Sequence, residues 1–115
     1  MVCYGAGNVA KKGLPILMKR YKIPYIIDCD KKKHGKKLYD IQIIPVNEKT
    51  VNSYPILVMV ENIKSVLDTL YVEMDCHVPI YRCIEYAGGY AVVEYRKDSL
   101  FPMVFDRSLF IPAKF

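Results

Sequence analysis

The chain has 115 residues, the length of one domain, and its 52% hydrophobic and 25% charged residues are ordinary for a soluble globular protein. The formal net charge is +5, and no apolar run reaches the roughly 18 residues that a membrane-spanning helix needs. Because Met1 leads directly into a short apolar stretch without a basic segment and a long apolar core, no signal peptide is recognised and the cytoplasm is the expected compartment.

The first predicted elements are a strand, a glycine-rich turn and a helix. Val2, Cys3 and Tyr4 form a short apolar run, typical of a buried strand. A helix is predicted over residues 8–21, although Pro15 should either kink it or lie in its first turn, because an interior proline removes a backbone hydrogen bond. The expected buried face of this helix consists of Leu14, Leu17, Met18 and Tyr21.

The middle of the chain continues this alternation. A second strand is predicted over 23–27, ending at Asp28, and a short extended segment over 38–44 follows a lysine-rich loop. Residues 56–60 form a continuous apolar run, the pattern of a strand buried on both faces of a parallel sheet. A helix is predicted over 63–74, with Asn62 as its N-cap.

The last third of the chain is predicted to be mostly extended. Residues 78–83 form another strand, residues 84–95 a hairpin that turns at Gly88-Gly89, and residues 99–115 an irregular apolar tail. Strands that alternate with helices favour a single α/β domain over 1–115, with a Rossmann-like parallel sheet and helices on its faces. The hairpin and tail, residues 78–115, are additions to that core.

The glycine-rich turn has the spacing of a nucleotide-binding loop. Gly5-x-Gly7-x-x-Ala10 follows a predicted strand and begins a helix, so Gly7 would let the backbone approach a diphosphate at the helix N-terminus. Asp28 comes 21 residues after Gly7, at the end of the second strand, where a carboxylate binds ribose in dinucleotide-binding domains. A tight glycine turn without a ligand is the alternative interpretation.

Residues 2–75 resemble a known family on four motifs. These motifs are Gly5-Ala6-Gly7, Asp28-Cys29-Asp30, Gly35-Lys36-Lys37 and Ile41-Gln42-Ile43-Ile44-Pro45. In this order they are similar to the nucleotide-sugar-binding N-terminal domain of bacterial sugar O- and N-acyltransferases of the sialic-acid and bacillosamine type. Similar domains occur beside glycosyltransferases and other enzymes of surface-polysaccharide synthesis.

The resemblance implies a binding domain for a nucleotide or nucleotide-sugar, as part of a larger transferase. By position in the family pattern, the implied binding residues are Gly5, Ala6, Gly7, Asn8, Val9, Asp28, Asp30, Glu61 and Asn62. The acyltransferases hold their catalytic base in a separate β-helix domain, and no hexapeptide repeat is present in these 115 residues. No catalytic residue is therefore assigned, and the chemistry is expected in another domain or chain.

The same residues fit two alternative functions. The glycine loop and Asp28 also fit an NAD-binding oxidoreductase fragment or a dinucleotide-sensing regulatory domain. Lys31 to Lys33 could accommodate the extra phosphate of NADP, but the carboxylate of Asp28 would repel that phosphate. A structural or interaction domain without a ligand is the other alternative. Tyrosines 81, 86, 90 and 95 are expected either to cover the sheet edge or to contact a partner, namely a second copy or a catalytic domain.

Other chemistries find little support. The four cysteines (3, 29, 76 and 83) have no zinc-binding spacing, so reduced thiols are expected and no metal site is assigned. The lysine cluster over 31–37 surrounds His34 and is expected to be a solvated loop, because no aromatic reading motif for nucleic acid accompanies it. Adjacent Cys76 and His77 would point to opposite faces of an extended chain, which disfavours a catalytic dyad.

Overall fold

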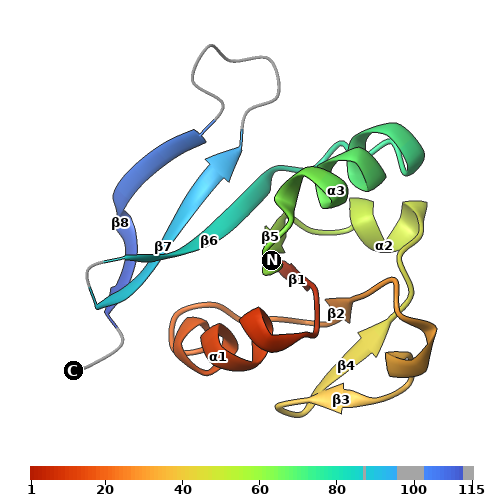
Figure 1. The fold of residues 1–115 in the computed structure, drawn as a ribbon, viewed down its shortest axis with the longest axis horizontal. Coiled ribbons are helices and arrows are strands. Elements are labelled where there is room, and N and C mark those ends of the chain that lie inside the picture. The colour runs from red at the N-terminus through yellow and green to blue at the C-terminus, as the bar shows by residue number, and fades with distance from the viewer. Residues whose placement is uncertain (87, 96–102, 113–115) are drawn as a thin grey trace.

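A computed structural model describes residues 1–86, 88–95 and 103–112 of the protein. The described strands form one mixed sheet of eight, and helices lie against it, so the protein has an α/β fold (Figure 1). The strands are β1 (Val2–Tyr4), β2 (Ile26–Ile27), β3 (Lys37–Leu38), β4 (Ile41–Ile44), β5 (Ile56–Val58), β6 (Ile80–Tyr86), β7 (Gly89–Tyr95) and β8 (Met103–Pro112). The helices are α1 (Asn8–Leu17), α2 (Glu48–Asn52) and α3 (Ile63–Asp68), with a 3₁₀ turn at Lys31–Lys33 and a π-helical turn at Thr69–Glu73 that continues α3.

The sheet has a parallel part and an antiparallel part. Strands β4, β2, β1, β5 and β6 lie side by side in this order and are parallel, which is a strand order found in doubly wound α/β sheets. Beyond β6, the strands β7 and β8 pair in antiparallel fashion, and β3 adds a short antiparallel edge next to β4. The order of the parallel strands changes direction between β1 and β5, at the centre of the sheet.

Each face of the parallel part is covered by helices. Alternate residues of the short strands point to opposite faces, so that Cys3, Ile26 and Leu57 pack with α1 on one face. Their neighbours, such as Tyr4, Ile27 and Val58, pack on the other face against α2, α3 and the π-helical turn. Figure 1 shows this arrangement, with α1 on one side of the sheet and α2 and α3 on the other. Both layers together bury the apolar runs that the sequence predicts as strands.

Helix α1 differs from the prediction in length and in its buried face. It ends at Leu17 rather than at residue 21, and the turn that follows closes with a hydrogen bond from the Tyr21 N–H to the Leu17 carbonyl. The buried positions are Ala10, Gly13, Leu14 and Leu17, whereas Met18 is 40% exposed. The actual face thus begins one turn earlier, because the small residues Ala10 and Gly13 let the helix approach the sheet closely.

Pro15 lies within α1 without ending it. A proline in a helix lacks the N–H that would bind the carbonyl four residues earlier, here that of Lys11. The hydroxyl of Tyr39, in the tight turn between β3 and β4, donates a hydrogen bond to this Lys11 carbonyl instead. Tyr39 has a φ of +50°, a conformation that costs free energy for a non-glycine residue. The contact between two segments far apart in sequence therefore compensates for the proline.

The C-terminal part corrects two predictions. The hairpin register pairs Tyr86 with Gly89, so Gly89 already belongs to β7, and the turn lies one residue earlier than predicted. The tail is not irregular over 103–112, because these residues form β8 along the edge of β7 with a register shift between Ala91 and Val93. The predicted tail residues 99–102 and 113–115 lie outside the described residues. The sequence analysis did not predict the five-residue helix α2. Its N-terminus is stabilised by a capping box between Asn47 and Thr50.

Among the described residues, no helix has the length and apolar character needed to cross a bilayer.

Candidate functional site

An open cleft lies at the carboxyl ends of the parallel strands. Its volume is about 330 Å³, and it is lined by Gly5, Gly7, Asn8, Val9, Asp28, Lys33, Met59, Val60 and Glu61. These residues follow β1, β2 and β5, and β1 and β5 flank the point where the strand order changes direction. Open α/β sheets bind their ligands in the crevice at this position, because the loops after the strands diverge there.

Gly5 is required by the fold itself. Its φ is +109°, and a Cβ at this position would lie 2.6 Å from Val60 Cγ1 and 3.0 Å from the Met59 carbonyl oxygen. The Gly5 N–H also donates to the carbonyl oxygen of Ile27 at 2.8 Å. The first glycine of the loop therefore allows the close approach of the β1 and β5 ends, independently of any ligand.

Neither the backbone conformation nor the packing at position 7 requires a glycine. The φ of −95° at Gly7 is accessible to any residue, and a Cβ added to it would meet no atom within 4 Å. Gly7 is the N-cap of α1 and gives this helix no side-chain hydrogen bond, whereas Asn47 and Asn62 cap α2 and α3 with theirs. The N-terminus of the ten-residue helix α1 thus opens toward the cleft with its backbone accessible.

Asp28 supports the glycine loop from the end of β2. Its Oδ2 accepts a hydrogen bond from the Ala6 N–H at 2.9 Å, and its Oδ1 accepts one from the Asp30 N–H at 2.8 Å. The side chain is 15% exposed. Both oxygens therefore have partners within the chain, so the position predicted for ribose binding also has a structural role. A carboxylate has about four acceptor positions, which leaves room for a ligand hydroxyl.

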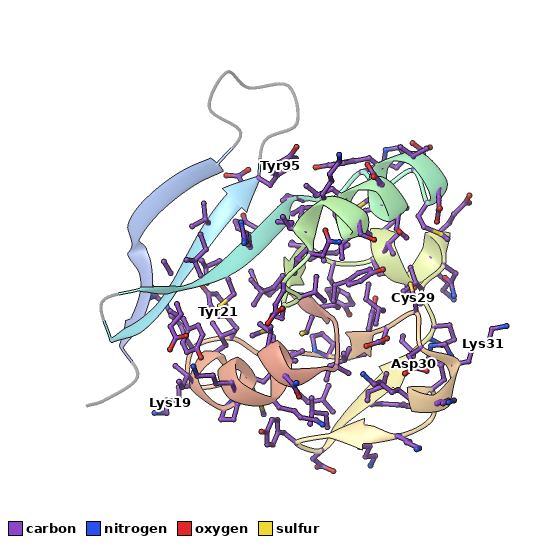
Figure 2. The ribbon with its side chains drawn as sticks, viewed as in Figure 1. Lys19, Tyr21, Cys29, Asp30, Lys31 and Tyr95 are labelled. Atoms are coloured by element: carbon purple, nitrogen blue, oxygen red, sulfur yellow. The ribbon has the colours of Figure 1, made fainter. Side chains whose placement is uncertain are left out.

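Lys33 is a cleft residue that the sequence analysis placed in a solvated loop. Its Nζ lies 3.4 Å from the Ala6 carbonyl oxygen and 3.9 Å from Asp28 Oδ2, with 35% of the side chain exposed. Asp30 is the N-cap of the 3₁₀ turn, and its side chain accepts a hydrogen bond from the Lys32 N–H. This turn directs Lys33 inward. Lys31 extends away from the molecule (Figure 2). The lysine run alone could not reveal which member turns inward.

Three of the implied binding residues do not line the cleft. Ala6 is 4% exposed, and its N–H is already donated to Asp28. Asp30 is exposed and caps the 3₁₀ turn, and Asn62 is exposed and accepts from the Ser65 N–H at the start of α3. The remaining implied residues, Gly5, Gly7, Asn8, Val9, Asp28 and Glu61, are brought together.

A second hollow adjoins the first and shares Asn8, Val9 and Glu61 with it. Its volume is about 240 Å³, and its other lining residues are Lys12, Cys83, Glu85 and Tyr90. It exists because β6 pairs with β5 only through residue 82 and then continues for four more residues past the end of β5. This hollow is called the second arm below, and the cleft at Gly7 the first arm.

The side chains of the second arm combine an apolar base with a charged rim. Tyr90 is 6% exposed and packs near Gly13, where a Cβ would lie 3.5 Å from its ring. On the rim, Lys12 Nζ contacts both carboxylate oxygens of Glu85 at 3.1 Å, and this pair joins α1 to β6. Burial, and next the carboxylate of Glu85, raise the pKa of the Cys83 thiol to about 12. Cys83 is therefore a neutral wall residue at physiological pH.

The hairpin tyrosines whose side chains the structure describes pack on the faces of the sheet within the chain rather than on its edge, and contact with a partner stays a prediction. Tyr90 is buried within the chain, and Tyr95 packs against Tyr71 of the π-helical turn, with ring centroids 6.1 Å apart. Tyr81 is partly buried in the core on the face of the sheet that α1 covers. The side chain of Tyr86 lies outside the described residues.

All four cysteines are free thiols. Burial raises the pKa of Cys3 well above its usual value, and Cys29 is exposed with its Sγ 3.2 Å from the Tyr4 hydroxyl. Within residues 1–86, 88–95 and 103–112, no group of three or more His, Cys, Asp or Glu side chains could hold a metal ion. Comparisons with protein-family models, with curated proteins and with solved structures find no match for this chain.

Proposed function

We propose that the chain is a binding domain for a nucleotide or nucleotide-sugar, with the diphosphate in the first arm. The observation that carries this proposal is Gly7. The fold does not require a glycine there, and the backbone of the α1 N-terminus is left accessible in a cleft at the carboxyl ends of β1 and β5. Close approach of a phosphate to the backbone is a reason for glycine at such a position.

Electrostatics support an anionic ligand. The N-terminus of α1 carries a partial positive charge of roughly half an elementary charge, and its first turn contains no acidic residue. The ammonium of Lys33 adds a full positive charge beside the same loop. Because Asp28 is engaged with two backbone N–H groups and lies near Lys33, its charge is partly balanced.

The role of such a domain would be to present the ligand to a transferase of sugar metabolism, as in the bacterial acyltransferases that the motifs resemble. The reacting group would extend beyond the cleft, and another domain or chain would supply the catalytic residues. A cytoplasmic location accords with this role. An NAD-binding domain is the second candidate, because Asp28 ends β2 and retains acceptor positions for a ribose hydroxyl.

Thermal unfolding with a ligand panel tests the proposal. The panel contains UDP, UDP-N-acetylglucosamine, CDP, GDP, NAD and NADP, each at high concentration. A ligand at about 100 times its Kd adds roughly 2.7 kcal/mol to the free energy of unfolding. Stabilisation by a nucleoside diphosphate or its sugar supports the proposal, stabilisation by NAD or NADP alone favours the second candidate, and no shift with any compound contradicts both.

A matched pair of lysine variants shows whether the ligand lies in the first arm. Lys33→Gln removes the cation beside the loop, and Lys32→Gln makes the same charge change on an exposed neighbour. Lys33→Gln should weaken binding by roughly 10-fold, the effect of about 1.4 kcal/mol expected from a charge-assisted contact. Equal effects of both variants would show that only the general charge of the loop matters.

A further inference from the structure

The two arms of the cleft differ in how their charged groups are arranged. The first arm has the N-terminus of α1, Lys33 and the carboxylate of Asp28, which two backbone N–H groups engage. The second arm has Glu85 and Lys12, which are paired with each other, and Glu61 lines both arms. An elongated ligand that lies across both arms therefore meets the helix N-terminus and Lys33 at one end, Glu61 in the middle and the Lys12–Glu85 pair at the other end.

Glu61 stands where the arms meet. It follows β5, is exposed, and lines both arms. Its backbone carbonyl accepts from the Ile63 N–H, but within the described residues its carboxylate has no hydrogen bond or ion pair. An unpaired carboxylate at this point can accept hydrogen bonds from hydroxyl or amide donors and repels anions.

The base of the second arm suits a group with an apolar face. Val9 is partly buried, Tyr90 is buried, and Cys83 is held neutral by its surroundings. Glu85 and Lys12 place acceptors and donors on the rim above this base. A pyranose ring has such a character, since its C–H face is apolar and its hydroxyls lie at the edge.

We infer that the second arm binds the group attached to the diphosphate, and that it selects an uncharged, hydroxyl-bearing sugar over an acidic one. This inference rests on the proposed function. Glu61 would accept from the sugar hydroxyls nearest the diphosphate, and Glu85 from those farther along β6. A carboxylate on the sugar would lie against both of these acidic side chains, and the one lysine of this arm, Lys12, is already paired with Glu85.

Isothermal titration with a matched pair of ligands tests the inference. UDP-glucose and UDP-glucuronate differ only in the oxidation of C6 from alcohol to carboxylate; GDP-mannose and GDP-mannuronate replace them if GDP is the stabilising diphosphate. We expect the neutral nucleotide-sugar to bind more tightly than the parent diphosphate. Its affinity should exceed that of the nucleotide-uronate by about fivefold or more. Fivefold corresponds to two like charges about 4 Å apart in water.

Two variants locate the selectivity. Glu61→Gln should reduce the preference for the neutral sugar, and Glu85→Gln should reduce it further because it leaves the Lys12 cation unpaired. Glu73→Gln, at an exposed position of the π-helical turn, makes the same charge change away from both arms and should leave the preference unchanged. Each of the three side chains is exposed, so the fold should tolerate all three variants.

The outcomes separate this inference from the proposed function. If the diphosphate binds but the neutral sugar adds no affinity, or if the uronate binds as tightly, the second arm is not a selective sugar site while the nucleotide site stands. If the preference is present but neither Glu61→Gln nor Glu85→Gln changes it, the sugar lies elsewhere and the inference is wrong. If no nucleotide binds at all, the proposed function itself fails.

Discussion

The two glycines of the loop should respond in opposite ways to the same substitution. Gly5→Ala places a methyl group 2.6 Å from Val60 Cγ1 and 3.0 Å from the Met59 carbonyl oxygen, at a φ of +109°. Gly7→Ala places one in open space at a φ of −95°. The pair therefore separates a glycine that the fold needs from a glycine that the fold does not need.

The magnitudes follow from these contacts. For Gly5→Ala, backbone strain costs roughly 1–3 kcal/mol and overpacking roughly 1–3 kcal/mol. The reduced freedom of the unfolded chain returns about 0.4–1 kcal/mol, so a net loss of about 1–5.6 kcal/mol is expected. For Gly7→Ala, the weaker N-cap propensity of alanine and the same gain in the unfolded chain nearly cancel, leaving a change within about 0.5 kcal/mol.

Urea unfolding followed by far-ultraviolet circular dichroism measures both changes, because the chain contains no tryptophan for fluorescence. For a domain of this size the loss in Gly5→Ala corresponds to a fall in Tm of roughly 4–22 °C, at about 4 °C per kcal/mol. Gly7→Ala should keep its stability and lose ligand stabilisation. If Gly7→Ala destabilised the protein as strongly as Gly5→Ala, the fold would explain Gly7, and its support for a ligand would disappear.

Three further predictions concern the supports around the site. Tyr39→Phe should lower the free energy of unfolding by about 0.5–1 kcal/mol. The loss should be clearly smaller in a Pro15→Ala background, because the N–H of Ala at position 15 can then bind the Lys11 carbonyl. A double-mutant cycle with no coupling between the two changes would contradict this. Asp28→Ala should destabilise the protein without ligand by about 2 kcal/mol through two lost charge-assisted hydrogen bonds, and Asp30→Ala by less than about 1 kcal/mol, as urea titrations would show. Burial raises the pKa of Cys83 from 9.0 to about 12, so the thiol of the unfolded chain ionises before that of the folded protein as pH rises. The free energy of unfolding should therefore fall above pH 9, by up to about 1.4 kcal/mol per pH unit from this group. A Cys83→Ala variant with the same alkaline profile would refute this cause.

Local patterns in the sequence predicted the elements that local chemistry determines. Val2 to Tyr4 is apolar and followed by glycine, and it forms the central strand. Asn62 precedes a helical apolar stripe, and its side chain caps α3. The alternation of strands and helices gave the α/β class correctly, because parallel neighbours need a crossover between them.

Nonlocal contacts determine what the sequence analysis missed. Pro15 was ambiguous because the group that compensates for it, the Tyr39 hydroxyl, is 24 residues away in the chain. Lys33 was indistinguishable from its neighbours until the 3₁₀ turn set its direction. The second arm depends on how far β6 extends past β5, and this register cannot be read from either strand alone.

The position of β1 has a consequence for the synthesis of the protein. This strand is made before both of its partners in the sheet, which are Ile26 and Ile27 on one side and residues 56–58 on the other. At translation rates of about 5–20 residues per second, roughly 3–10 s separate Val2 from Ile56. During that interval one edge of an apolar strand has no native partner. The nascent chain should therefore depend on protection of β1, and completion of the sheet centre should be a late step in its folding.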